Sequence, residues 1–258
     1  MPEDINKVAA FIEAAIEELG AFNPAAPAKV MDFGCGRGQL VHALSKLGFD
    51  TYGCDITAYW LGDHLPISEG LSTISLSPYR LPFDENTFDF VISTSVLEHA
   101  QNKEDCFREI HRVLRPGGYS MHLYPGKWYL PYEPHIYVPL ANYFWPHCPK
   151  WWLGLWALLG VRNEFQQDQP WQAVAAVNNR YCQEGLSYWT TRQYQELSLK
   201  VFGNCHWPMQ FYIDNASGGF ARIFKRFPFK AVSGALSRET RMGFMIQQKD
   251  GLIPFPLQ

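Results

Sequence analysis

The stretch KVMDFGCGRGQLV, residues 29 to 41, decides the fold of this chain. It begins with an apolar run that contains an acid, Asp32, and that predicts a short buried strand. Three glycines follow at every second position: Gly34, Gly36 and Gly38. Residues 39–47 then have helical spacing, so the glycines lie in a turn between a strand and a helix. Such a turn lets backbone N–H groups and the positive helix end approach a ligand closely.

The spacing of the glycines limits which ligand this turn can hold. A dinucleotide fingerprint, GxGxxG, would place its third glycine where the chain has Gln39, and no phosphate-binding GxxxxGK[ST] string occurs. The next predicted strand, FDTYGCD, ends in Asp55, and a carboxylate there can accept hydrogen bonds from both hydroxyls of a ribose. The turn therefore predicts a nucleoside ligand without a diphosphate.

Strands and helices alternate along the first half of the chain. Helices are expected at 4–19, 39–47, 103–114 and 190–202, and strands at 29–33, 49–55, 71–76, 87–94, 119–124 and, at a sheet edge, 242–250. This alternation predicts an α/β, Rossmann-like, doubly wound and mostly parallel sheet of about seven strands. We expect residues 1–124 to form the N-terminal helix and the cofactor-binding part, 125–189 a substrate cap, and 190–258 the C-terminal completion of the α/β domain.

Tryptophan is concentrated after the fifth predicted strand. Eight of the nine tryptophans lie between residues 128 and 207, interleaved with prolines, which predicts an aromatic-rich insertion or cap. Three interpretations stay open: a lid with a substrate pocket, a peripheral membrane contact through Trp151, Trp152 and Trp156, or a homodimer surface.

Composition excludes several classes of partner and site. A net charge of −3 over 258 residues, with a pI near 6.2, gives no basic surface for nucleic acid. The six cysteines have neither CxxC pairs nor zinc spacing, so reduced thiols are expected. No secretory signal is visible, the longest apolar stretch is too short to span a bilayer, and we expect a cytoplasmic protein with possible membrane-peripheral contact.

Four collinear segments carry a resemblance to a known family. They are VMDFGCGRG, YGCDIT, LPFDENTFDFVISTSVLEH and FREIHRVLRPGGYSMHL, within residues 28–124. Together they resemble the class I S-adenosylmethionine-dependent methyltransferases, in particular the type 11-like branch that acts on small molecules, lipids and glycans. The resemblance implies S-adenosylmethionine as the cofactor and methyl transfer as the activity.

The resemblance also implies a set of cofactor-binding residues. The glycines would line the methionine part, Asp55 would hold the ribose, and Asp32 would orient the loop or the amino group. Ser77 stands where the family often has an acid for the adenine, which leaves that contact in question. The full set is Asp32, Gly34, Cys35, Gly36, Gly38, Asp55, Ile56, Ser77, Ser93 and Ser95.

Two segments offer a base for the methyl acceptor. Glu98 and His99 follow the fourth strand, and YEPHIYVP supplies Glu133 and His135 after the fifth. We expect O-methylation of a small-molecule, glycan or lipid-linked acceptor, with His135 or His99 as the base and Glu133 beside it.

Other roles for these residues stay open. His99 can instead brace the cofactor pocket, and Glu133 and His135 can serve as structural hydrogen-bonding groups of the cap. A metal site from Glu133, His135 and His147 is conceivable, but its spacing is not diagnostic and no metal is expected. The alternatives to an enzyme are a non-catalytic nucleoside-binding protein of the same fold and a membrane-surface interaction protein.

Overall fold

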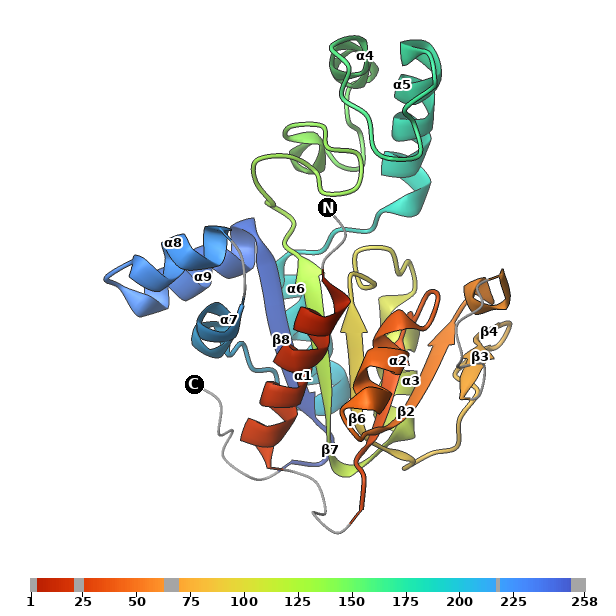
Figure 1. The fold of residues 1–258 in the computed structure, drawn as a ribbon, viewed down its shortest axis with the longest axis vertical. Coiled ribbons are helices and arrows are strands. Elements are labelled where there is room, and N and C mark those ends of the chain that lie inside the picture. Colours follow the sequence, from red (N-terminus) through yellow and green to blue (C-terminus); the bar gives the residue numbers. More distant parts are fainter. Residues whose placement is uncertain (1–3, 21–25, 63–69, 217–218, 252–258) are drawn as a thin grey trace.

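Strand β1, which contains Asp32, lies near the centre of a six-stranded sheet with the order β3-β2-β1-β6-β7-β8 (Figure 1). The computed structural model describes residues 4–20, 26–62, 70–216 and 219–251. All neighbouring strands are parallel except β7 and β8. The strands are β1 (Lys29–Phe33), β2 (Asp50–Asp55), β3 (Leu71–Thr73), β6 (Phe88–Thr94), β7 (Leu114–Pro125) and β8 (Met242–Gln248). The predicted α/β class, the mostly parallel sheet and the edge position of the last strand are confirmed.

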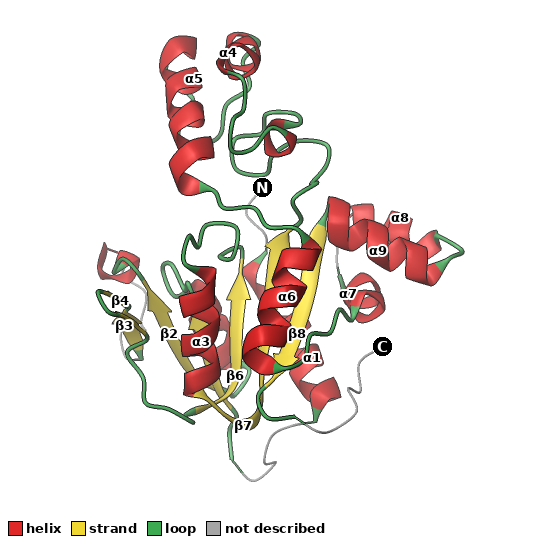
Figure 2. Cartoon of the chain, turned by 180° about the vertical axis from the view of Figure 1, so that it is seen from behind, coloured by secondary structure: helices red, strands yellow, loops and turns green. Residues whose placement is uncertain are grey.

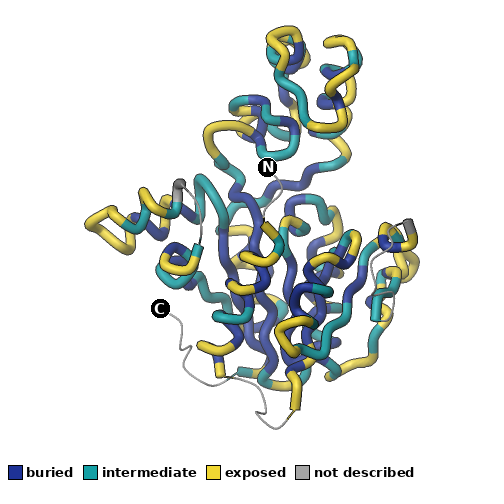
Figure 3. Tube along the Cα trace, viewed as in Figure 1, coloured by how far each residue is buried: buried dark blue, intermediate teal, exposed yellow. Residues whose placement is uncertain are grey.

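Helices cover both faces of this sheet. Successive strand side chains alternate, so Val30 and Phe90 join one apolar core while Met31 and Val91 join the other. Helices α1 and α2 cover the first face (Figure 1), and α3 and α6 the second (Figure 2). Their bounds are α1 (Ile5–Leu19), α2 (Gln39–Lys46), α3 (Lys103–Val113) and α6 (Thr191–Phe202). Burial on both faces explains the near-continuous apolar runs of the central strands (Figure 3).

Two predicted elements differ from the structure. The expected strand 71–76 divides, because the chain leaves the sheet after β3 and forms a separate hairpin from β4 (Ser75–Leu76) and β5 (Tyr79–Arg80). The strand expected at 119–124 begins earlier, at Leu114 directly after α3, so the RPGG segment lies inside β7, where the register with β6 shifts between Phe88 and Phe90. The extra residues of β7 form a bulge in its pairing with β6, and α3 leads directly into β7.

Residues 126–189 form a lobe beyond the carboxyl ends of the strands (Figure 1). It contains η2 (Ala141–Tyr143), α4 (Lys150–Leu158), α5 (Trp171–Arg180) and a π-helical turn, η3 (Tyr181–Gly185). The lobe has its own small core, which includes Ile136, Leu153 and Cys182. Trp152 and Trp156 pack against this core, whereas Trp151 is 69% exposed.

The chain returns from this lobe to the sheet through α6 and then builds three more helices beside β8. They are α7 (Met209–Asn215), α8 (Gly219–Arg226) and α9 (Lys230–Thr240), in a region for which the sequence pattern gave no assignment. A single turn of 3-10 helix, η1 (Tyr59–Gly62), follows β2. Within the described ranges, no helix is long and apolar enough to cross a bilayer.

Candidate active site

The glycine turn between β1 and α2 has the backbone that its sequence predicts. Gly34, Gly36 and Gly38 all adopt positive φ, at 80°, 52° and 78°. A Cβ on Gly34 would lie 2.4 Å from Cγ2 of Val96, so only glycine fits at this close approach of the loop after β6. The turn is also tied to β2, because the Gly34 N–H donates to the Cys54 carbonyl at 2.8 Å.

Gly36 differs from its neighbours because it faces open space. A Cβ there would meet no described atom within 4 Å. Its N–H donates to Oδ2 of Asp55 at 2.8 Å, which joins the turn to the carboxyl end of β2. The two features expected to contact the nucleoside therefore lie side by side.

Asp32 supplies an unused acceptor next to this turn. Its side chain is buried, and Oδ1 has no hydrogen-bond partner within the described part of the chain. Burial, and secondarily the charge of Asp55, raises the pKa of Asp32 to about 7. A buried acceptor without a partner is costly, and an ammonium group donating to it would remove that cost. The residues present therefore fit the amino-acid part of S-adenosylmethionine.

The remaining predicted cofactor residues are placed differently. The Ser93 hydroxyl lies 2.7 Å from Nδ1 of buried His122, so it is already engaged inside the sheet. Ser95 and Ile56 are exposed at strand ends, and Cys35 is buried beside Val41. Ser77 is exposed in the turn between β4 and β5, and is separated from the end of β3 by the departure of the chain from the sheet.

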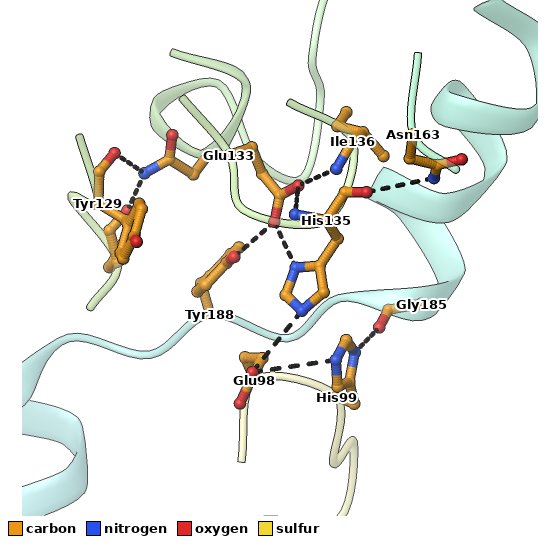
Figure 4. Close-up of polar contacts among 11 residues, drawn as sticks. Glu98, His99, Tyr129, Glu133, His135, Ile136, Asn163, Gly185 and Tyr188 are labelled. Atoms are coloured by element: carbon orange, nitrogen blue, oxygen red, sulfur yellow. Dashed lines mark hydrogen bonds and ion pairs between the residues drawn. The ribbon is translucent and has the colours of Figure 1, made fainter. Parts of the chain in front are cut away.

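A second group of polar side chains lies where the cap meets the sheet (Figure 4). We call it the polar cluster: Glu98, His99, Glu133 and His135. Glu133 is fully buried and accepts hydrogen bonds from His135 Nδ1 and the Tyr188 hydroxyl, both at 2.7 Å, and from the backbone N–H groups of His135 and Ile136, both at 2.8 Å.

These hydrogen bonds fix the charge of Glu133 and the orientation of His135. Burial alone would raise the pKa of Glu133, but the bonds from His135 and Tyr188 lower it below its ordinary value. Burial lowers the pKa of His135, yet its bond to Glu133 and the charges of Glu133 and Glu98 raise it overall. Nδ1 of His135 must donate to the carboxylate, so its Nε2 is the nitrogen turned toward Glu98.

Glu98 lies opposite these groups without comparable partners. Its side chain has 0% exposure, and among the described residues neither carboxyl oxygen has a hydrogen-bond partner. Two imidazole nitrogens lie near Oε1, Nε2 of His135 at 3.8 Å and Nε2 of His99 at 4.0 Å. Burial raises the pKa of Glu98 to about 7.

The orientation of His99 is set by the π-helical turn of the cap. Nδ1 of His99 donates to the Gly185 carbonyl at 2.7 Å, and burial lowers the pKa of this imidazole. The rings of His99 and His135 are 4.8 Å apart, so both Nε2 atoms are directed to the same place.

Several contacts of the polar cluster could not be predicted from the sequence pattern. Glu133 and His135 do contact each other as predicted, but in a turn closed by the Tyr137 N–H on the Glu133 carbonyl, not in an extended segment. His147, considered as a metal ligand together with Glu133 and His135, is exposed. The sequence did not predict that Tyr188 and Gly185 belong to this site. Tyr188 contacts Glu133 across 55 residues of the chain, and Gly185 contacts His99 across 86 residues.

The cofactor turn and the polar cluster are adjacent. Val96, whose side chain closes on Gly34, stands only two residues before Glu98. Both groups therefore lie at the carboxyl ends of the central strands, where open α/β sheets bind their ligands.

Residues 31–121 match the family model of the methyltransferase domain. The match includes the glycine turn, Asp55, Glu98 and His99. This segment of the chain is similar to the methyltransferase domain.

Curated relatives match the same segment of this chain. A sterol 24-C-methyltransferase (ERG6B) of Gibberella zeae is 33% identical over 97 residues, which cover 35% of this chain and 26% of the relative. An arginine-hydroxylase, NDUFAF5 of mouse mitochondria, is 35% identical over 92 residues, or 34% of this chain and 26% of the relative. The matched segments thus span about a quarter of the length of these curated relatives.

Solved structures extend the likeness to the whole fold. A phosphoethanolamine N-methyltransferase 2 of Haemonchus contortus, in complex with phosphomonomethylethanolamine and S-adenosylhomocysteine, aligns with a TM-score of 0.51 at 14% identity. The alignment covers 93% of this chain and 52% of that chain. At this identity the comparison establishes the shared α/β architecture.

Proposed function

We propose that this protein is a methyltransferase, which transfers the methyl group of S-adenosylmethionine to a hydroxyl oxygen of a small-molecule, glycan or lipid-linked acceptor. The observation that carries the proposal is the buried, unpartnered Oδ1 of Asp32 beside a glycine turn that is open at Gly36. S-adenosylmethionine, when bound, supplies a methyl group on a positively charged sulfur.

The cofactor residues follow from this placement. Asp32 accepts from the amino group, the backbone of Gly34, Gly36 and Gly38 lies along the methionine part, and Asp55 accepts from the ribose hydroxyls. Asp55 already accepts a hydrogen bond from the Gly36 N–H, so its carboxylate is held toward the turn. Cys35, Ile56, Ser77, Ser93 and Ser95 stay secondary members of this predicted site.

The acceptor hydroxyl must lose a proton, and the polar cluster offers the groups that take it up. Nδ1 of His135 donates to Glu133 and Nδ1 of His99 donates to Gly185, which leaves one nitrogen of each neutral ring as an acceptor. We assign the base to His135 or His99, with Glu133 as the group that positions His135. Positioning of the reacting atoms and exclusion of water supply the rest of the rate enhancement.

Residues 125–189, which include the lobe, serve as the substrate cap in this proposal, between the two parts of the α/β domain, 1–124 and 190–258. Its apolar core and half-buried tryptophans favour an acceptor with apolar surface. Contact of the cap with a membrane or a second copy stays a prediction.

One relative is named as a hydroxylase, so methyl transfer by this protein has to be tested by an assay. Methyl transfer from labelled S-adenosylmethionine into a cell extract is measured, with the products split into organic and aqueous phases. We expect label with the wild type and with Asp50→Ala, a control at the opposite end of β2, and none with Asp55→Ala. The labelled phase separates lipid-linked from soluble acceptors.

Calorimetric titration of S-adenosylmethionine completes this test. Binding by the wild type, together with a large loss in Asp55→Ala, is the expected result. Absence of binding by the folded wild type would overturn the proposal, because the site would then not hold the methyl donor.

A further inference from the structure

We propose that Glu98, His99 and His135 bind a divalent transition-metal ion at the junction of the sheet and the cap. Each residue offers one ligand atom, a carboxylate oxygen or an imidazole nitrogen, and these atoms all lie within 4.8 Å of one another. Two of the residues follow β6 and the third belongs to the cap, so the ion would join the two parts of the molecule.

The free atoms of the two histidines are the right ones for a metal. In both neutral rings Nδ1 carries the proton, since it donates to Gly185 in His99 and to Glu133 in His135. The lone pair therefore lies on Nε2 in each ring, and both Nε2 atoms face Glu98 Oε1, at 4.0 Å and 3.8 Å. A metal-binding histidine usually donates its other nitrogen to a carboxylate or a carbonyl in this way.

Glu98 provides an independent reason for a cation. Both oxygens of this fully buried side chain are without hydrogen-bond partners in the described ranges, although most buried polar atoms are bonded. Neither imidazole comes within hydrogen-bond distance of it. A dication between the three side chains would compensate the carboxylate and use all the free atoms.

The donor set narrows the type of ion. Two imidazoles and one carboxylate are ligands for Zn²⁺, Fe²⁺ and similar ions, whereas Mg²⁺ and Ca²⁺ prefer oxygen alone. Bonds of about 2.0–2.2 Å need the ligand atoms closer than they are, so the side chains would have to move toward the ion when it binds. Three protein ligands leave a position open for water or for an acceptor oxygen.

The consequence for the reaction rests on the function proposed above. An acceptor hydroxyl bound at the open position would lose its proton to water more readily, while its oxygen keeps the electron pair that attacks the methyl group. The ion is neither oxidised nor reduced. It would take over the activation of the hydroxyl that is otherwise assigned to an imidazole.

The experiment measures metal binding directly, without methyl donor or acceptor. Metal-free wild-type protein is titrated with Zn²⁺ against a chromophoric chelator, and with Co²⁺ while its visible absorption is recorded. We expect one equivalent of tightly bound metal and a Co²⁺ spectrum without a thiolate charge-transfer band, since the ligands are nitrogen and oxygen.

Matched variants locate the site. Glu98→Gln and His135→Asn should weaken Zn²⁺ binding by about 100-fold or more, and Glu133→Gln, which loses the charge that orients His135, by about 10- to 100-fold. His147→Asn, an exposed histidine of the cap, should bind like the wild type. Glu98→Gln keeps the size of the side chain and removes an unpartnered charge, so it should fold.

Wild type that binds Zn²⁺ no more tightly than folded Glu98→Gln would overturn the metal site. That result would leave the proposed methyl transfer untouched, because donor binding and label transfer are measured separately. Conversely, tight Zn²⁺ binding in a protein that binds no S-adenosylmethionine would support the metal site and remove the proposed function.

Discussion

At the scale of single residues, Asp32 is expected to favour ligand binding while lowering the stability of the folded protein. Its carboxyl group is buried beside Asp55 with one oxygen unpartnered, so the folded protein without a ligand favours the neutral form. The unfolded chain ionises near the ordinary value of an aspartate, about 3.9, whereas the folded chain does so at about 7. An ammonium group in the site would favour the ionised form instead.

This difference predicts how pH changes the free energy of unfolding. Below about pH 4 Asp32 is protonated in both states and costs nothing. As pH rises toward 7 only the unfolded state ionises, so stability falls by up to about 4 kcal/mol and then levels off. Urea unfolding of wild type and Asp32→Asn at pH 5 and pH 8 should show the variant gaining relative stability at pH 8.

The control for this prediction is Asp168→Asn, which changes an exposed aspartate of the cap. It should follow the wild type at both pH values. If the free energy of unfolding changes with pH in the same way for Asp32→Asn and the wild type, the prediction fails, because the carboxyl group is then not buried as the structure has it.

Gly34 and Gly36 should respond differently to alanine. Gly34→Ala meets Val96 at 2.4 Å in a left-handed conformation, and should lower the free energy of unfolding by about 2–4 kcal/mol. Gly36→Ala has open space and should cost about 1 kcal/mol, yet its methyl group occupies the space of the cofactor and should weaken binding about tenfold or more.

Denaturant melts and calorimetric titration of S-adenosylmethionine check the glycine pair. The prediction fails if Gly36→Ala binds the cofactor as the wild type does, because the open side of the turn would then not be the binding surface.

At the scale of elements, α3 begins with an unusual residue. Lys103 is buried, and its Nζ donates to the Ala100 and Ser187 carbonyls, both at 2.6 Å, and to the Ser187 hydroxyl at 2.8 Å. A cation at a helix N-terminus is electrostatically unfavourable. Its role is therefore to fasten the segment that leaves the cap to the start of α3.

Removal of this amine should loosen that connection. Lys103→Met keeps the apolar stem but leaves buried carbonyls without a donor, and should lower the free energy of unfolding by about 2–4 kcal/mol. Limited proteolysis should cleave residues 181–189 faster in the variant. Lys46→Met, at the exposed end of α2, is the control and should match the wild type in both measurements.

Elements were predictable where periodicity decides them. Helices α1 and α6 and strands β1, β2 and β6 follow their apolar patterns, and α1 ends at Gly20 with positive φ. The expected strand 71–76 divides because, after Ile74 donates to the Asp55 carbonyl, the chain leaves the sheet. That departure depends on pairing with β2 and on the hairpin that follows, which an apolar pattern does not specify.

At the scale of the whole molecule, the cap tryptophans have unequal roles. Trp151 is exposed, whereas Trp152 packs on the cap core and its Nε1 donates to the Pro139 carbonyl at 2.7 Å. Trp151→Glu should leave the free energy of unfolding within about 0.5 kcal/mol of the wild type. Trp152→Ala should lower it by about 3 kcal/mol.

Thermal melts of the two variants check this contrast, and equal destabilisation would contradict the packing of the cap. The same Trp151→Glu variant tests the predicted membrane contact without unfolding the lobe. Vesicle flotation that is equal for wild type and variant would argue against a contact through Trp151.

The sequence alone determined the strand, glycine turn and helix of the predicted cofactor site, because the residues that form them are close together in the chain. A strand, three glycines, a helix and an acid at the next strand end lie within 27 residues, and each has a conformational requirement that a short pattern reveals. Only the tertiary structure decided the polar cluster. Glu98, His135, Gly185 and Tyr188 meet because the cap folds back over the strand ends, and contacts across 55 and 86 residues depend on packing rather than on periodicity.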